Sequence, residues 1–317
     1  MATVAPTGSG STIASPTTAR TAPGAARRRR PRWPLALYLG PGMLGFSVFI
    51  VLPLLFSLVM SLYDWPLFGQ AEFVGLENYR RMLTGDPAFW ASLFTTVLFA
   101  IVYTAANLAV CLGLSYWLMS LGRRWASSFR VLFFIPVVTP MIGNALIFRL
   151  MLNDDGVVNQ MLARLGISGP SWLSTPGWAM VSLVLMSLWQ GIGYNIIVLG
   201  AGIAGISPSV LEASRIDGAG PILRFTRVIF PMLSPTVFFC TVMTVIGAFK
   251  VFAQPYALTE GGPANSTTTL VLLLYRNGFS YDRLGYASAL AWALFVVVML
   301  ITAFQFSQQK RWVSYDS

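Results

Sequence analysis

Amide and aromatic side chains recur within otherwise apolar stretches of this sequence. Tyr103 and Asn107 are four residues apart, as are Gln190 and Tyr194, so each pair would share one face of a helix. Amides exchange hydrogen bonds with hydroxyl groups, and aromatic rings stack on the apolar faces of sugar rings. Such side chains are candidates for a solute pathway, because exposing them to lipid is costly. The other residues of this kind are Asn144, Trp189 and Asn195.

These side chains also have a purely structural interpretation. Amides and hydroxyls commonly form hydrogen bonds between the helices of a membrane bundle, without any contact with a solute. For each of these residues the sequence is therefore compatible with two roles, contact with a carbohydrate and hydrogen bonding between helices.

The sequence offers little for bond-making chemistry. It contains no histidine, which is the commonest proton shuttle and metal ligand. No G-x-x-x-x-G-K-[ST] phosphate loop occurs in it, so the chain would not hydrolyse ATP by that route. Cys111 and Cys240 fall inside apolar blocks and are predicted to be packing residues. We therefore expect no catalytic residue, no metal site and no cofactor bound by this chain.

A polar segment at 204–228 separates two of the apolar blocks. Ser207 can cap a short helix with Pro208 at its first position and Glu212 on its surface, and Pro221 can open a second helix. This pair of helices is too short to cross a membrane and suits a groove on a cytosolic partner. Its turn is supplied by Asp217 and Gly218, and its apolar side by Val210, Leu211 and Ile216.

The composition indicates a membrane protein. Of the 317 residues, 56% are hydrophobic and 10% are charged, whereas a soluble globular domain has about 25% charged residues. The net charge of +10 could suggest nucleic-acid binding, but the positive residues are dispersed at the ends of apolar blocks. The one dense cluster precedes the first block, where it is a topology signal and a contact for membrane lipid; it comprises Arg27, Arg28, Arg29, Arg30 and Arg32.

Six apolar blocks are long enough to cross about 30 Å of hydrocarbon as helices. We expect an all-α membrane protein with a disordered basic tail at 1–32, a first span at 33–62 and an outer loop at 63–89. The other five spans would lie within 90–307, followed by a tail at 308–317. The blocks run approximately over 35–62, 90–121, 128–152, 177–203, 229–251 and 285–307.

The third block contains two prolines, Pro136 and Pro140. Each lacks the N–H group that an uninterrupted helix needs. Neighbouring helices can satisfy the backbone groups that are freed, so a kinked span is favoured over a broken one.

The distribution of Lys and Arg predicts the orientation. With the N-terminus inside, 14 of the 21 Lys and Arg residues fall on cytoplasmic segments, as the positive-inside rule requires. Both termini are therefore predicted to be cytoplasmic. Arg149 and Lys250 lie near the outer ends of spans and can extend to the lipid headgroups.

The polar segment also carries a motif. Glu212-Ala213-Ser214 is followed after three residues by Gly218, and nine residues later by Val228, Phe230 and Pro231. This resembles the EAA loop of binding-protein-dependent ABC importer permeases, E-A-A, three residues, G, nine residues, I-x-L-P. The departures are Ser for the third Ala, Val for Ile and Phe for Leu. Carbohydrate permeases of the maltose and glycerol-3-phosphate type are the most similar, on Leu132–Pro136, Tyr194-Asn195, Leu258–Pro263, Thr267–Leu270 and Arg311–Val313.

The resemblance implies a type I ABC importer permease fold in the plasma or inner membrane. The segment 204–228 would be the coupling loop, seated in a groove of an ATPase subunit, with sugar uptake as the activity. The implied partners are a second similar permease, an extracellular solute-binding protein and two ATPase subunits, which would use ATP and Mg. The residues implied in coupling are Glu212, Ala213, Asp217, Gly218, Ala219, Phe225 and Pro231.

Other activities remain as alternatives. A secondary transporter usually carries carboxylates within its spans, and none lies mid-span in this sequence. A membrane enzyme acting on lipid would need the histidine or clustered acidic residues that are missing here. Within the importer class, glycerol-phosphate compounds, peptides and polyamines are alternative solutes to sugars.

Overall fold

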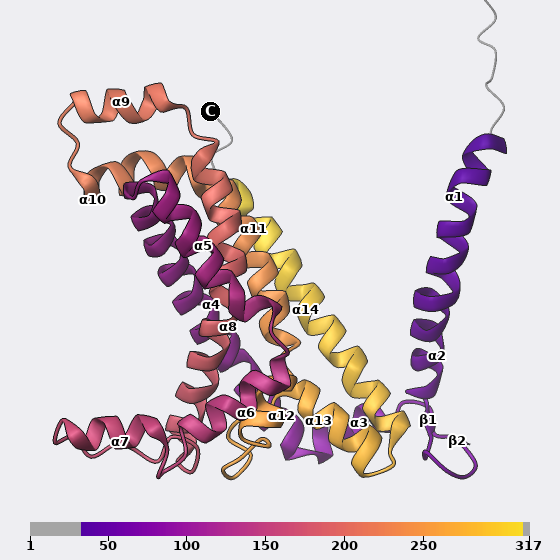
Figure 1. Ribbon diagram of the computed structural model, residues 1–317. Coiled ribbons are helices and arrows are strands. Elements are labelled where there is room, and N and C mark those ends of the chain that lie inside the picture. The colour runs from indigo at the N-terminus through magenta and orange to yellow at the C-terminus, as the bar shows by residue number, and fades with distance from the viewer. Residues whose placement is uncertain (1–32, 313–317) are drawn as a thin grey trace, which may run out of the picture. The chain divides into compact units, whose positions relative to one another are not determined.

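The computed structural model describes residues 33–312, so the predicted tail at 1–32 and the last five residues lie outside the described part. The chain divides into two units, one ending at Leu52 and one beginning at Pro53, and each is described by itself. Helices dominate both units (Figure 1).

The first unit is built from apolar helix. Helix α1 covers Trp33–Phe46, and a π-helical turn, η1, covers Ser47–Val51. The widened turn closes with a hydrogen bond from the Leu52 N–H to the Ser47 carbonyl, immediately before Pro53, which has no N–H to donate. Together with α2 (Leu52–Met60) these turns give a candidate membrane span over Leu37–Met60 with a mean hydropathy of 2.5.

Small elements of the second unit follow α2 and lead to the first long helix. Asn78 ties them together, because its Nδ2 donates to the carbonyls of Ser61 and Tyr63 at 2.9 Å each. Gly285 of the last helix lies so close that a Cβ there would be 1.9 Å from the Tyr63 carbonyl oxygen. The elements are the antiparallel strands β1 (Tyr63–Asp64) and β2 (Glu72–Phe73), helix α3 (Glu77–Arg80) and π-turn η2 (Arg81–Gly85).

Four long helices form the body of the second unit. Three of them begin with proline at the first turn, where its missing N–H costs nothing. Their core includes Cys111 and Cys240, both free and fully buried, in agreement with the predicted packing role. The long helices are α4 (Pro87–Ser120), α8 (Pro176–Ala204), the continuous run of α10 (Pro221–Arg224), η3 (Phe225–Ile229) and α11 (Phe230–Phe249), and α14 (Leu284–Trp312).

The third apolar block is broken, and the expectation of a kinked span is therefore wrong. Helix α5 (Arg123–Val138) and helix α6 (Met141–Met151) meet at 98°. Pro140 disfavours helical geometry at Thr139, which is extended with φ −83° and ψ 148°. The described residues thus hold five candidate spans, or six if the bent pair is counted as one.

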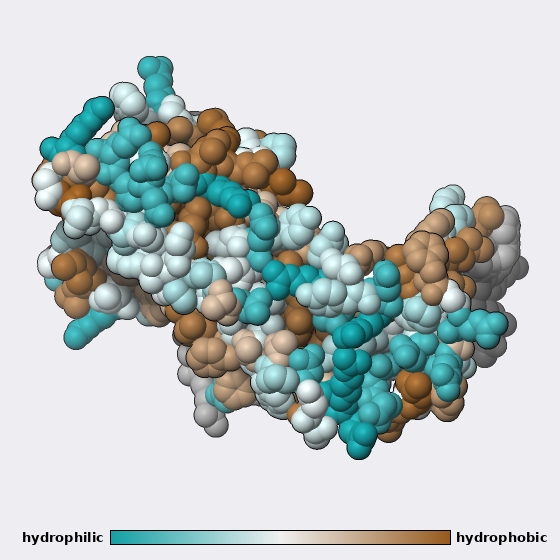
Figure 2. Space-filling model, turned by 90° about the horizontal axis from the view of Figure 1, so that it is seen from below, coloured by the Kyte–Doolittle hydropathy of each residue, from teal (hydrophilic) through white to brown (hydrophobic). Residues whose placement is uncertain are grey.

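Short elements gather at the two ends of the long helices. Helices α9 and α10 lie at one end, and α6, α7, α12 and α13 lie at the opposite end (Figure 1). Figure 2 looks onto the latter end, where hydrophilic side chains form much of the central surface. The remaining bounds are α7 (Val157–Arg164), α9 (Pro208–Ile216), α12 (Ala253–Leu258), α13 (Leu270–Tyr275) and π-turn η4 (Arg276–Ser280).

Candidate coupling loop and solute pathway

The segment 204–228 folds into a helix, a turn and a second helix, as its prolines predict. Helix α9 has Pro208 at its first position, and α10 opens at Pro221. The predicted side-chain cap is wrong, because the Ser207 hydroxyl bonds to the Ser209 hydroxyl at 2.8 Å and not to a backbone N–H. The helix start is instead closed by the Ser207 carbonyl, which accepts the Val210 N–H at 3.2 Å.

The turn that ends α9 explains why glycine stands at position 218. The Ala219 N–H donates to the Ser214 carbonyl at 3.0 Å, and the Gly218 N–H donates to the Arg215 carbonyl at 3.1 Å. This is the Schellman arrangement, which needs a left-handed residue after the helix. Gly218 adopts φ +75°, a conformation that costs glycine almost nothing.

The loop exposes both charged and apolar side chains. Glu212, Ala213 and Asp217 are exposed on α9 and its C-cap. Two large apolar side chains are almost fully exposed, Ile216 at 85% and Ile222 at 81%. Apolar side chains framed by charge at the end of a bundle are suited to docking against another protein.

The loop is anchored to the bundle through Tyr116 of α4. The Tyr116 hydroxyl donates to the Pro221 carbonyl at 2.9 Å, and its ring lies 5.0 Å from the ring of Phe225. Phe225 in turn packs against Phe230, and Pro231 is half-buried at the start of α11. Sequence reasoning did not identify Tyr116, since no local signal links a tyrosine on α4 to a turn about a hundred residues away.

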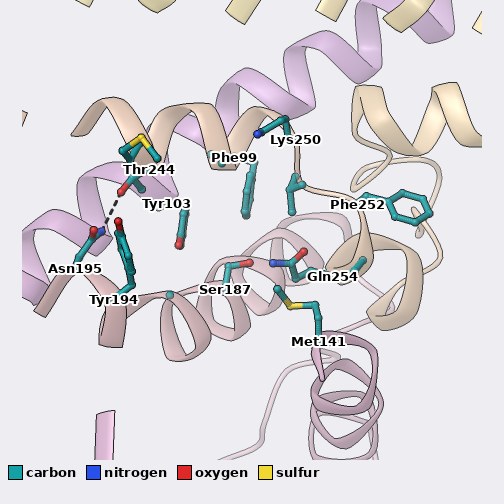
Figure 3. Close-up of a pocket in the computed structure, with 16 residues that line it drawn as sticks. Phe99, Tyr103, Met141, Ser187, Tyr194, Asn195, Thr244, Lys250, Phe252 and Gln254 are labelled. Carbon is teal, nitrogen blue, oxygen red and sulfur yellow. Dashed lines mark hydrogen bonds between the residues drawn. The ribbon is translucent and has the colours of Figure 1, made fainter. Parts of the chain in front are cut away.

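A cavity of about 550 Å³ lies among α4, α6, α8, α11 and the segment after α11. Tyr103 and Phe99 of α4 stack at 5.4 Å on one side, and Tyr194 and Asn195 of α8 lie on another (Figure 3). The lining residues of the other segments include Met141, Thr244, Lys250, Phe252 and Gln254.

Asn195 is held in a fixed orientation at the wall of this cavity. Its Nδ2 donates to Asn107 Oδ1 at 2.6 Å and to Thr244 Oγ1 at 2.9 Å. Asn195 Oδ1 and Ser187 Oγ are buried and lack a hydrogen-bond partner among the described residues, although both residues line the cavity. Buried polar atoms normally find a partner, so these two atoms keep unused hydrogen-bonding capacity directly behind the surface of the cavity.

The chain matches the family model described as the binding-protein-dependent transport system inner membrane component over residues 108–313. The chain belongs to this family. It is therefore an inner-membrane permease of an ABC importer, and the segment 204–228 lies inside the matched region.

Relatives of this permease share most of its length. It is 34% identical to a probable ABC transporter permease protein, YesP of Bacillus subtilis, over 88% of this chain and 91% of the relative. It is 35% identical to the lactose transport system permease protein LacF of Rhizobium radiobacter, over 85% of this chain and 92% of the relative. The fold is also that of a bacterial alginate ABC transporter, which was solved in complex with an alginate pentasaccharide-bound periplasmic protein. The TM-score is 0.78 and the sequence identity is 20%, over 88% of this chain and 95% of that chain.

The predicted pathway residues of the permease do not all meet at one place. Tyr103, Tyr194 and Asn195 line the cavity, and Asn107 lies behind Asn195 as its hydrogen-bond partner. Gln190 shares a face of the continuous helix α8 with Tyr194, as expected, but it does not line the cavity. Gln190 is buried and its Nε2 donates to the Thr139 carbonyl at 3.4 Å.

The two other predicted residues lie outside the cavity lining. Asn144 Nδ2 donates to Thr139 Oγ1 at 2.6 Å, next to the break between α5 and α6. Trp189 is 40% exposed and packs its ring 5.3 Å from that of Phe148. Asn144 therefore holds the start of α6 at the break, and Trp189 packs α8 against α6.

Several lining residues escaped the sequence reasoning. Thr244 and Ser187 are single hydroxyls in apolar helices, a pattern too common to single out. Lys250 was expected to extend to the headgroups, but it lines the cavity at the end of α11. Arg149 forms an exposed ion pair with Glu260 at 2.8 Å.

Proposed function

We propose that this permease forms, with a second permease subunit, the pathway through which a sugar enters the cytoplasm. Two separate ATPase subunits would supply the energy and an extracellular solute-binding protein would deliver the sugar. The relatives named for lactose and alginate transport support a carbohydrate as the solute.

The observation that carries the proposal is the pairing of aromatic rings with polar side chains around one cavity. Tyr103 and Tyr194 offer ring faces, and the other lining residues include the amide side chains of Asn195 and Gln254. A sugar presents apolar ring faces and hydroxyls in the same molecule, so it complements both kinds of group.

The charge of the cavity narrows the class of solute. Lys250 lines it, and no carboxylate does. A cationic polyamine would meet repulsion there, because like charges in a partly desolvated site are unfavourable. Neutral sugars and sugars that carry an acidic group both fit this arrangement.

The loop 204–228 is the proposed contact with the ATPase. Glu212 on α9 and the exposed Ile216 and Ile222 would enter a groove on that subunit, with the loop and both chain termini on the cytoplasmic side. Tyr116 and Phe225 would pass the movement of the loop to α4 and α11, since both side chains connect the loop to the bundle.

The test is reconstitution of the permease with its partner subunits in vesicles. We expect a sugar presented on the solute-binding protein to stimulate ATP hydrolysis and to be taken up. Glu212→Ala is expected to abolish uptake while the protein stays in the membrane, whereas Glu72→Ala, on an exposed strand remote from the loop, is the matched control. Sugar uptake that persists after ATP depletion would contradict the proposal.

A further inference from the structure

A second cavity, of about 530 Å³, lies at the end of the bundle opposite to α9. It is bounded by η2, the first turns of α4, the loop before α13, and η4 with the residues after it. Three guanidinium groups line it, from Arg81, Arg276 and Arg283. The hydrogen-bonding side chains of Ser92, Asn265, Thr268, Asn277 and Tyr281 also face it.

None of these three arginines has a carboxylate partner among the described residues. The ion pairs formed there join Arg80 to Glu77 and Arg149 to Glu260, and neither Arg81 nor Arg283 takes part. Arg81 lies over the ring of Tyr286, with its Cζ 5.1 Å from the ring centroid. A smaller neighbouring cavity is lined by both arginines and by Asp64, Glu77 and Asp282, yet none of these carboxylates is paired with them.

The single acidic side chain in the larger cavity is already engaged. Asp86 Oδ1 accepts the Ala88 N–H at 2.9 Å and so caps α4, and its Oδ2 accepts the Tyr286 hydroxyl. Three positive groups therefore face one carboxylate whose oxygens are both bonded. Holding like charges together around one space is unfavourable unless an anion joins them.

The third arginine is fixed in place. Arg276 Nη1 donates to Asn265 Oδ1 at 3.1 Å, and its Nη2 donates to the Glu260 carbonyl. These bonds hold the loop 259–269 against η4 and keep one guanidinium at the cavity wall in a defined direction. A fixed guanidinium suits the planar, two-pronged recognition of phosphate or carboxylate oxygens.

The position of the cavity bears on the source of the anion. Arg283 directly precedes the candidate span of α14, and Arg81 lies six residues before that of α4. Side chains at the ends of spans lie at the level of the lipid headgroups. The volume also exceeds what a lone oxyanion fills, leaving room for the organic part of a phosphate ester.

From this geometry we infer that the cavity lined by Arg81, Arg276 and Arg283 binds a phosphate group. The group comes either from the headgroup of an anionic phospholipid or from a soluble phosphate. This site is separate from the cavity around Asn195, and it does not depend on which solute the permease carries.

The test uses the full-length chain in nanodiscs made of phosphatidylcholine, with or without phosphatidylglycerol. Binding of radiolabelled orthophosphate is measured at constant ionic strength, and retained phosphatidylglycerol is measured by native mass spectrometry. We expect the double variant Arg81→Gln, Arg283→Gln to bind at least tenfold more weakly than the wild type, because charge-assisted hydrogen bonds are lost. The control Arg164→Gln removes one positive charge from the exposed end of α7, and it matches the single variant Arg283→Gln; it should bind within twofold of the wild type.

Each result decides whether the cavity binds a phosphate group and from which source the group comes. Saturable orthophosphate binding in phosphatidylcholine supports the site with a soluble source, and retention of phosphatidylglycerol alone supports it with a lipid source. The site is ruled out if neither probe binds, or if the double variant binds as well as the wild type. Should the double variant fail to fold, Arg283→Gln alone decides, because no hydrogen bond or ion pair of that side chain supports the fold among the described residues.

Discussion

The orientation of Asn195 depends on two hydrogen bonds made by a single amide nitrogen. One reaches Asn107 on α4 and the other reaches Thr244 on α11, so the residue joins three helices at the wall of the cavity. Its Oδ1 is thereby turned into a defined direction without a partner among the described residues. A side chain fixed in this way keeps the wall of the cavity in one shape, so that a solute can bind with little further loss of conformational entropy.

Thr244→Val tests this positioning role. Loss of the hydroxyl removes one of the two bonds to Asn195, which is worth about 0.5–1.5 kcal/mol. We expect the KM for sugar uptake to rise roughly two- to tenfold. Thr244→Ser keeps the hydroxyl and should stay close to the wild type; equal KM values for the Val and Ser variants would remove Thr244 from this role.

Substitutions at Gly218 test how the turn after α9 contributes to the proposed coupling. No atom lies within 4 Å of the position that a Cβ would occupy, so a side chain there meets no obstacle and only the φ of +75° opposes it. Gly218→Val should destabilise the turn by roughly 1–2 kcal/mol and reduce sugar-driven ATP hydrolysis in the assembled importer. Asn tolerates the left-handed region far better, so Gly218→Asn should retain most of that activity. Equal losses in both variants would mean that the side chain, and not the backbone strain, disturbs coupling.

At the scale of elements, the contact between α5 and α8 depends on a glycine. A Cβ at Gly193 would lie 2.2 Å from the Phe133 carbonyl oxygen, which is backbone and cannot turn aside. Gly193→Ala should therefore lower stability by about 1–3 kcal/mol, which a thermal unfolding curve in detergent would detect. Gly177→Ala is the matched control on the same helix, since nothing lies within 4 Å of its added methyl group. Equal unfolding temperatures for the two variants would show that the helices can separate without cost.

The break between α5 and α6 shows what the sequence could not decide. Pro140 makes helical geometry unfavourable at Thr139, but a proline inside an apolar block is compatible with a kink as well as with a break. The contacts that hold the break come from distant residues, because the Thr139 carbonyl accepts the Gln190 side chain of α8. The apolar blocks predicted at 90–121 and 177–203 agree closely with the helices that start at Pro87 and Pro176. The block predicted at 229–251 begins later than the helical run that starts at Pro221, because the first turns of that run carry polar and charged residues.

At the scale of the whole molecule, the coupling loop was far easier to predict than the cavity. The loop is one continuous segment whose prolines and glycine determine its turns locally. The cavity is lined by residues from α4, α6, α8 and α11. Which residues line it therefore depends on how these helices pack and on which face of each helix points toward the cavity. Helix periodicity placed Gln190 beside Tyr194, but only the packing of α8 against the α5–α6 break shows that Tyr194 lines the cavity while Gln190 bonds to Thr139.

The orientation of the permease can be tested with its own buried cysteines left in place. Cys111 and Cys240 are each 0% exposed, so a hydrophilic, membrane-impermeant maleimide should not reach them. Ile216→Cys adds a thiol to the exposed tip of α9, and Asp154→Cys adds one to the exposed loop at the opposite end of the bundle. The test uses cells that express the permease without its ATPase subunits, because a docked ATPase would cover Ile216. If α9 faces the cytoplasm, intact cells should then label only the Asp154→Cys protein, and permeabilised cells should label both. Labelling of Ile216→Cys in intact cells would put the loop outside, where no ATPase could reach it, and the coupling proposal would fail.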